Sequence, residues 1–342
     1  MDLQDRSYEI VVVGGGAAGT SAALSSARAR RSVLVVDAGE PRNAPAGGVH
    51  NYLGREGTPP GDLVAAGRVE AERYGAEFAT GEVIAAERAP DGDFRLTLDG
   101  GTAVTAARLV IATGLVDELP PVPGLAQRWG REVLHCPYCH GWEVRDRHVA
   151  VLGTGPMAPH QALLWRQWSP RITLLRHDLG ELGSEDRAKL DARGITVVPG
   201  PVEGVRVEAD RLTGVEVGGH VLACDALVVA PLFTARLGAL ADLGLRTEPV
   251  WRGDTPVGAR LPVDASGATA VPGVWAAGNV TDLTGNVISA AAAGANVAAQ
   301  VNFDLVEADT RADLRRAAGQ DPFLVREREV ADLVAGERRH GL

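Results

Sequence analysis

The stretch EIVVVGGGAAG, residues 9–19, decides the fold. Its first five residues form a short apolar run, which predicts a buried strand at residues 9–13. The glycine turn and the alanine-rich segment after it predict a helix to about Arg30, and the next apolar run predicts a second strand at residues 32–36. Strand, glycine turn, helix and strand in this order form a βαβ unit, which indicates an α/β fold.

The glycines of this turn have separate mechanical tasks. Gly14 permits the tight turn from strand to helix, Gly16 lets a pyrophosphate approach the backbone, and Gly19 lets the helix pack closely on the strand. The start of the helix supplies free N–H groups and a positive dipole end for the phosphates. Asp37 ends the second strand, where a carboxylate can bind ribose hydroxyls. The unit is therefore predicted to bind a dinucleotide.

A second unit of the same kind follows a proline-rich linker at residues 120–123. Its predicted strand at 149–152 leads into Gly153-Thr154-Gly155 and a helix to about Trp168. A third nucleotide-type segment at 273–279 precedes a helix of small residues at about 287–303. We expect two Rossmann-like domains of the three-layer ββα type. A charged tail follows at 309–342.

Composition narrows the class of protein. The chain has 342 residues, 45% of them hydrophobic, which is enough for two domains with sizeable cores. The formal net charge is −10, and Lys189 is the only lysine, so nucleic acid and anionic membranes are disfavoured as partners. Residues 1–8 show no signal-peptide pattern, and the apolar runs are too short to span a bilayer. We expect a cytoplasmic protein.

Two of the three cysteines form the motif Cys136-Pro137-Tyr138-Cys139. This spacing brings the sulfurs within reach of a disulfide, and a position at a helix start gives one thiol thiolate character. Structural zinc needs four ligands, commonly in two close pairs, and Cys224 stands alone in an apolar strand. The pair is therefore predicted to be redox-active rather than metal-binding, and Cys224 to be a buried apolar side chain.

Histidines flank the cysteine pair on both sides. His140 directly follows the second cysteine, where an imidazole can act as acid and base at neutral pH. His135 directly precedes the pair and is the second candidate. The alternative for each is a histidine without a catalytic task.

Taken in order, these motifs resemble the low-molecular-weight thioredoxin reductases over roughly residues 8–305. Further matching elements are the loop His50–Gly54, the segment Ala112–Gly114 and the turn Gly153–Ala158. The resemblance implies an FAD domain in two pieces, residues 1–118 and 247–308, with a pyridine-nucleotide-type domain inserted between them at 119–246, and a homodimer. It implies FAD contacts from Gly14, Gly16, Ala17, Ala18, Gly19, Asp37, Arg42, Asn51, Val83, Thr113, Gly114, Gly278, Asn279, Asn286 and Val287.

The chain departs from the reductases in three places. His140 stands where reductases carry an acid, and residues 136–143 (CPYCHGWE) resemble a branch that includes the dithiol oxidases of gliotoxin and holomycin biosynthesis. Asn279 replaces the usual Asp near the flavin, and it can still bind a hydroxyl. The third departure is the NADPH site, where reductases carry His-Arg-Arg-x-x-x-Arg.

Residues 176–182 (RHDLGEL) occupy the position of that arginine motif. One arginine remains, and Asp178 would repel a phosphate. Pro156 and Pro159 remove N–H donors from the phosphate-binding turn, and His160 and Gln161 replace an acid pair. The site is predicted to be degenerate, with loose binding of NADH as the alternative.

The sequence thus favours an FAD-dependent dithiol oxidase that closes a disulfide in a small natural-product dithiol, with O2 as acceptor and H2O2 as product. The resemblance implies that the substrate attacks Cys136 and that Cys139 faces the flavin, while His140 accepts and returns thiol protons. An NAD(P)H-dependent reductase of thioredoxin or a small disulfide is the first alternative. A non-catalytic flavin redox sensor is the second.

Overall fold

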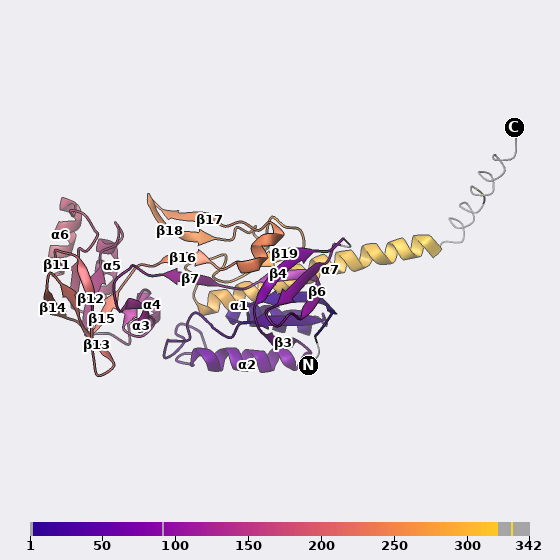
Figure 1. Ribbon diagram of the computed structural model, residues 1–342, viewed down its shortest axis with the longest axis horizontal. Helices are drawn as coiled ribbons and strands as arrows, with labels where there is room; N and C mark the ends of the chain where they lie inside the picture. The colour runs from indigo at the N-terminus through magenta and orange to yellow at the C-terminus, as the bar shows by residue number, and fades with distance from the viewer. Residues whose placement is uncertain (1–2, 91, 321–329, 331–342) are drawn as a thin grey trace, which may run out of the picture.

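The computed structural model describes residues 3–90, 92–320 and 330. Two open sheets lie toward the two ends of an elongated body, and a smaller sheet lies between them (Figure 1). No helix in the described ranges is long and apolar enough to span a membrane.

The first sheet has seven strands in the order β3-β2-β1-β6-β5-β4, with β19 also paired to β6. Its parallel strands are β1 (Arg6–Val13), β2 (Val33–Asp37), β3 (Glu77–Thr80), β6 (Ala103–Ile111) and β19 (Val274–Ala276). The hairpin β4 (Val83–Arg88) and β5 (Phe94–Leu98) continues it antiparallel. Consecutive residues Ile10, Val11 and Val12 are fully buried, because parallel strands are covered on both faces.

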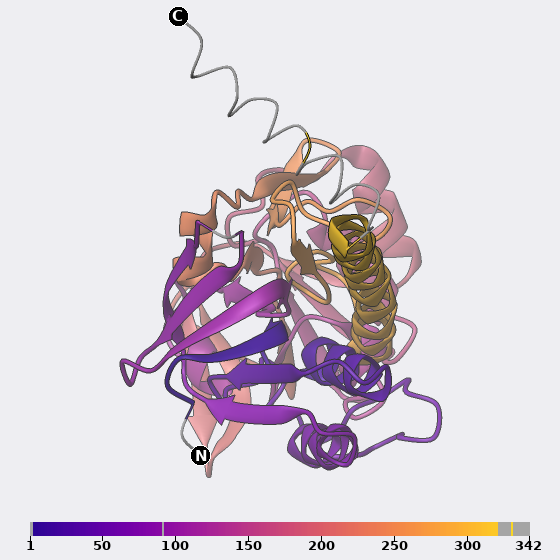
Figure 2. The same ribbon diagram turned by 90° about the vertical axis from the view of Figure 1, so that its right-hand side faces the viewer.

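Three helices belong to this sheet: α1 (Ala17–Arg28), α2 (Pro60–Glu72) and α7 (Val287–Gln320). Figure 2, seen along the long axis, shows α1 in indigo beside α7 in yellow. The two helices touch backbone to backbone, since a Cβ on Gly294 of α7 would lie 1.9 Å from the Ala18 carbonyl oxygen of α1. Only glycine permits that approach.

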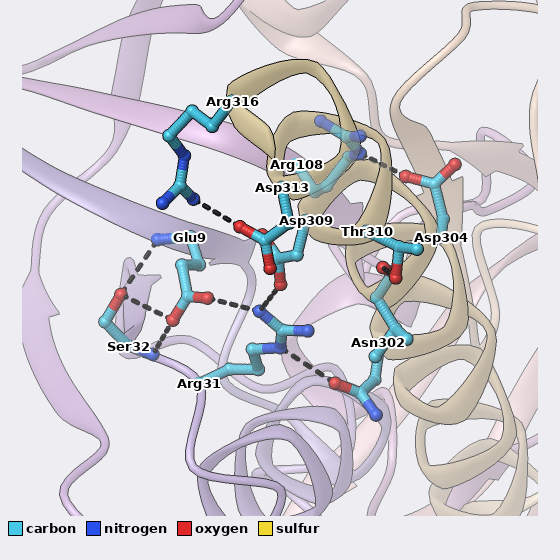
Figure 3. Close-up of polar contacts among 11 residues, drawn as sticks. Glu9, Arg31, Ser32, Arg108, Asn302, Asp304, Asp309, Thr310, Asp313 and Arg316 are labelled. Carbon is cyan, nitrogen blue, oxygen red and sulfur yellow. Dashed lines mark hydrogen bonds and ion pairs between the residues drawn. The ribbon is translucent and has the colours of Figure 1, made fainter. Parts of the chain in front are cut away.

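The helix α7 is longer than the sequence pattern predicted. Its expected end at about residue 303 moves to Gln320, because residues 304–318 contain no Gly or Pro to stop it. Arg31 anchors its middle by donating to Asn302 (2.8 Å), Asp309 (2.8 Å) and Glu9 (2.6 Å), as Figure 3 shows. The first part of the expected tail is thus helical, and residues 321–329 and 331–342 lie outside the described residues.

The second sheet is parallel, with the strand order β11-β10-β9-β15-β8. Its strands are β8 (Val133–Leu134), β9 (His148–Leu152), β10 (Arg171–Leu175), β11 (Thr196–Val198) and β15 (Ala226–Val228). An antiparallel sheet joins β12 (Val202–Glu208), β13 (Arg211–Val217) and β14 (His220–Ala223). The helices here are α3 (Leu125–Arg128), α4 (Pro137–His140), α5 (Ala158–Trp165) and α6 (Ser184–Ala192).

The smaller middle sheet has the order β17-β18-β16-β7. It comprises β7 (Leu115–Glu118), β16 (Leu232–Ala235), β17 (Glu248–Arg252) and β18 (Thr255–Arg260), and a 3₁₀ helix η1 (Gly238–Leu243) follows β16. Ala235, Leu240 and Leu245 pack in the same core as Val11 and Leu109 of the first sheet. The segment from Ala235 to Leu245 therefore packs on the first sheet, while the rest of β16 pairs within the middle sheet.

Candidate active site

A cavity of about 490 Å³ lies between the glycine turn of β1–α1 and the C-x-x-C segment, a size typical of cofactor and ligand sites. Most of the residues expected at the site line it. They are Gly14, Gly16, Ala17, Ala18, Asp37, Arg42, Val83, Thr113, Gly114, Cys136, Cys139, His140, Gly278, Asn279, Asn286 and Val287. The fold thus brings the dinucleotide turn and the dithiol to one cavity.

The glycine turn has the properties of a pyrophosphate site. The N–H groups of Gly16, Ala17 and Ala18, at the start of α1, have no acceptor among the residues that the structure describes. A Cβ on Gly16 would meet no protein atom within 4 Å, so this part of the cavity is open to a ligand. Asp37 accepts the Gly15 N–H through Oδ1 at 2.8 Å, which fixes the carboxylate at the cavity wall.

Gly19 is not among the lining residues and has the packing task that the motif predicted. A Cβ there would lie 1.8 Å from the Gly14 carbonyl oxygen, inside any permitted contact distance. Gly14 itself has φ = 104°, which a side chain rarely adopts.

Arg42 and Asn51 have protein partners that the sequence did not predict. Arg42 donates to both carboxylate oxygens of Asp117, at 2.7 and 2.6 Å, and its guanidinium lies 5.4 Å from the ring centre of Phe233. Asn51 is not among the lining residues, and its Nδ2 donates to the Tyr138 carbonyl at 2.7 Å. That bond ties the loop after β2 to the C-x-x-C segment.

Cys136 is the residue that precedes α4, and its sulfur is stabilised as a thiolate. A hydrogen bond from the Cys139 thiol and the N–H groups of Cys139 and Tyr138 lower the pKa of Cys136 to about 7, against the opposing effect of burial. The Arg42 charge acts in the same direction. The pKa of Cys139 is raised, because its proton is held by Cys136 and its sulfur is buried. Cys136 is therefore the ionised member of the reduced pair.

Both flanking histidines line the cavity. Burial lowers the pKa of His140, with Glu143 opposing and His50 assisting, so the imidazole is a neutral base at neutral pH. Burial also lowers the pKa of His135, whose Nδ1 is 3.0 Å from the Val229 carbonyl oxygen. Since a carbonyl only accepts, Nδ1 carries the proton and Nε2 is left as an acceptor. Cys224 is buried in the second domain, and burial raises its pKa to about 12.

In the loop after β10, the basic side chains pair with carboxylates of the same loop. Arg176 donates to Glu181 at 2.8 Å, and His177 Nε2 lies 3.3 Å from Asp178 Oδ2. The one arginine left to hold a nucleotide phosphate is thus paired internally with Glu181, and Asp178 adds a second carboxylate to the loop.

The comparisons with known proteins agree with this geometry. The family model described as pyridine nucleotide-disulphide oxidoreductase matches residues 8–296. The chain belongs to this family. Pyridine nucleotide-disulphide oxidoreductases of the thioredoxin reductase type bind FAD, so the protein is a flavin-dependent disulfide oxidoreductase, and the open glycine turn fits that cofactor.

The family's named relatives include fungal proteins. Thioredoxin reductase tcpT of Claviceps purpurea is 32% identical over 317 residues, covering 88% of this chain and 95% of the relative. Thioredoxin reductase sirT of Leptosphaeria maculans is 30% identical over 323 residues, covering 89% and 96%. The crystal structure of HlmI has a TM-score of 0.84 at 45% identity, covering 91% of this chain and 96% of that one. The resemblance to thioredoxin reductases that the motifs indicated is confirmed.

Proposed function

We propose that this disulfide oxidoreductase oxidises a small-molecule dithiol to a disulfide and passes the electrons to dioxygen, which leaves as hydrogen peroxide. One observation favours oxidation of a dithiol over reduction of a disulfide. In the loop at 176–181 the Arg176 guanidinium is paired with Glu181, and Asp178 adds a second negative charge. A reductase needs that loop to bind NADPH. The dithiol site, by contrast, is complete, with a stabilised thiolate and a neutral imidazole on one cavity.

The exchange steps follow from the two cysteine environments. A substrate thiolate attacks Sγ of Cys136 in the Cys136–Cys139 disulfide, the S–S bond breaks, and Cys139 leaves and takes a proton because its pKa is high. The second substrate thiolate then attacks the substrate sulfur of the mixed disulfide and expels Cys136. A thiolate of low pKa is the better leaving group, which suits Cys136 to this step. The substrate loses two electrons and two protons, and the cysteine pair gains the electrons.

FAD, when bound, supplies the two-electron acceptor that returns the cysteine pair to the disulfide. The residues that would hold it are the turn Gly14–Gly19 with Asp37, together with Thr113, Gly114, Gly278, Asn279, Asn286 and Val287 on the cavity wall. His140 accepts the proton from an attacking thiol, since its imidazole is neutral at the working pH.

The test is turnover of a panel of small dithiols in air with and without NADPH. We expect each disulfide formed to consume one dioxygen and release one hydrogen peroxide, at a rate that NADPH does not change. NADPH-dependent reduction of thioredoxin or of a small disulfide would instead establish the reductase function, which the names of the fungal relatives favour. Absence of both activities in FAD-loaded protein would favour the redox sensor.

We further propose that two copies of the chain associate through the outer face of α7. Phe303, Val306 and Leu314 lie on one side of this helix and are exposed, opposite the buried Val301 and Leu305. The end of α7 leaves the body of the molecule (Figures 1 and 2), and a short isolated helix is marginal in water, so a partner is needed to cover it. The resemblance to thioredoxin reductases implies a homodimer, so a second copy of the chain is the expected partner for this face.

Replacing Leu314 with glutamate should therefore weaken this dimer. A charge placed in an apolar contact costs its desolvation, and we expect the dissociation constant measured by analytical ultracentrifugation to rise at least about tenfold. Val221→Glu, at an exposed valine of β14, is the matched control and should leave the dissociation constant unchanged. If Leu314→Glu leaves the dissociation constant unchanged, the dimer interface lies elsewhere.

A further inference from the structure

A third imidazole, His50, lines the cavity that holds the dithiol, beside His135 and His140. Its loop is closed by the bridge between Val49 and Thr58 and continues into Asn51, which has φ = 59°. The Asn51 side chain donates to the Tyr138 carbonyl within the C-x-x-C motif. His50 is thus held in a defined place beside α4, although it comes from the loop after β2.

His50 lies between two carboxylates. Its Nδ1 is 2.6 Å from Glu56 Oε1, and its Nε2 is 3.5 Å from Glu143 Oε1. Glu56 also accepts the Asn51 N–H at 2.9 Å, so its carboxylate clamps the turn. The side chain of His50 is 21% exposed, against 65% for Glu56 and 43% for Glu143. The imidazole is therefore on the cavity side and the carboxylates are on the solvent side.

His50 and His140 are electrostatically coupled. The charge of His50 lowers the pKa of His140, and the charge of Glu143 raises it. The hydrogen bond with His50 and the Asn51 N–H lower the pKa of Glu56, so that this carboxylate is ionised. These charged groups face the two imidazoles from the loop and from the segment that follows α4. Both imidazoles line one cavity, and Glu143 lies 3.5 Å from His50 Nε2 and also acts on His140, so the arrangement offers a proton on His140 a route toward solvent.

The dithiol chemistry leaves one proton to be moved. The substrate releases two protons, Cys139 takes one because its pKa is raised, and Cys136 is the weaker acceptor for the other because its pKa is lowered. The second proton therefore passes to His140, and His140 must lose it before the next thiol can be deprotonated. The proton is recovered when dioxygen takes up two electrons and two protons to form hydrogen peroxide.

We propose that His50, held between Glu56 and Glu143, is the positioning and proton-exchange partner of His140 and connects the dithiol cavity to solvent. The assignment rests on the proposed dithiol oxidation. It adds three residues, His50, Glu56 and Glu143, to those that the motifs indicated.

The test compares His50→Gln with Arg55→Gln in the FAD-loaded protein. Arg55 lies in the same loop, pairs with Glu70 at 3.9 Å and does not contact His50, so it is the matched control. We expect His50→Gln to lower kcat about tenfold near neutral pH, below the roughly 10²–10⁴-fold contribution of a direct base such as His140. The deficit should shrink as the pH rises toward the thiol pKa, about 8.5, and added free imidazole should restore turnover.

Two measurements distinguish proton exchange by His50 from a purely structural role of this residue. In NMR titrations, removal of the His50 charge should raise the pKa of His140, so the acid limb of kcat/KM moves to higher pH, whereas Arg55→Gln should leave both unchanged. FAD content and thermal midpoint of His50→Gln should match the wild type. If they do not, Glu56→Gln, at an exposed side chain, should give the same imidazole-sensitive loss of kcat.

The proposal is overturned if a folded His50→Gln variant turns over at the wild-type rate across roughly pH 6–9 or if free imidazole restores nothing. An unshifted His140 titration in that variant also overturns it. If the wild-type protein oxidises no dithiol, the proposed function fails. The His140 titration in His50→Gln then still decides whether His50 and His140 are coupled.

Discussion

Cys136→Ser and Cys139→Ser will each reduce dithiol oxidation by more than about 10³-fold, because loss of a catalytic nucleophile can cost about 10⁶ in kcat. Either serine prevents the intramolecular disulfide, so neither variant can accept electrons from a substrate dithiol. The measurement is oxygen uptake with a small dithiol, after FAD content has been shown to equal that of the wild type. Retention of turnover by either variant would remove the pair from the proposed mechanism.

The two variants differ in the reactivity of the thiol that remains. Cys139→Ser keeps Cys136, whose thiolate is stabilised by the N–H groups of Tyr138 and Cys139 and by a donor at position 139 that the serine hydroxyl can replace. We expect it to react rapidly with an alkylating agent and to trap an aromatic disulfide as a mixed disulfide visible by mass spectrometry. Cys136→Ser keeps the half-buried Cys139, whose pKa is raised and which, unlike Cys136, is not stabilised by backbone N–H groups of the described residues, so it should react more slowly.

A matched pair at position 139 isolates the hydrogen bond. Cys139→Ala removes the donor and should raise the pKa of Cys136 above that in Cys139→Ser, as measured by the pH dependence of alkylation. Because the folded pKa is the lowered one, the thiolate fraction and the alkylation rate fall as the pH drops through it. Equal profiles for the serine and alanine variants would show that backbone N–H groups alone set the acidity.

Gly19→Ala and Gly16→Ala will separate folding of the glycine turn from binding of the cofactor. The methyl group that Gly19→Ala adds would lie 1.8 Å from the Gly14 carbonyl oxygen, an overlap within backbone that cannot move aside. Overpacking of this kind costs about 3 kcal/mol or more, so Gly19→Ala should lower the thermal midpoint of the protein and its FAD content together.

Gly16→Ala should bind little FAD while its apoprotein stays as stable as the wild-type apoprotein. Its Cβ meets no protein atom within 4 Å, and its φ of −69° suits alanine, but the methyl group enters the space that a pyrophosphate needs. Gly100→Ala, in the turn between β5 and β6, also has no neighbour within 4 Å and does not adjoin a lining residue, so it is the control and should keep full FAD content. A fully loaded Gly16→Ala protein would show that the phosphates lie elsewhere.

The sequence predicted the parts of this molecule that are encoded locally. The strand β1, the turn at Gly14–Gly19 and the helix α1 follow from a glycine and apolar pattern within one short stretch, and the structure places them as expected. The cysteine pair at the start of α4 was likewise visible from its spacing. In each case neighbouring residues alone fix the backbone.

What the sequence did not predict depends on contacts between distant residues. Asp117 and Arg42 meet only because β7 and the loop after β2 converge, and Asn51 finds Tyr138 across the cavity. His50 belongs to a loop that the family resemblance had singled out, but its carboxylate partners were not evident from its neighbours alone. The pairing of β16 with β7 in the middle sheet, and the packing of Ala235, Leu240 and Leu245 on the first sheet, were not evident from the sequence because they join residues more than a hundred positions apart.

The backbone contact between Gly294 and Ala18 sets an order of events during synthesis of the chain. The turn that receives the pyrophosphate leaves the ribosome first, but the helix that braces it is among the last segments to emerge. The strand β19, which completes the sheet beside β6, also comes late. Contacts between residues far apart in the sequence cannot form during early elongation, and they slow folding. A nascent chain that ends before α7 should therefore remain colourless, and the yellow colour of the flavoprotein should develop only once α7 has been synthesised.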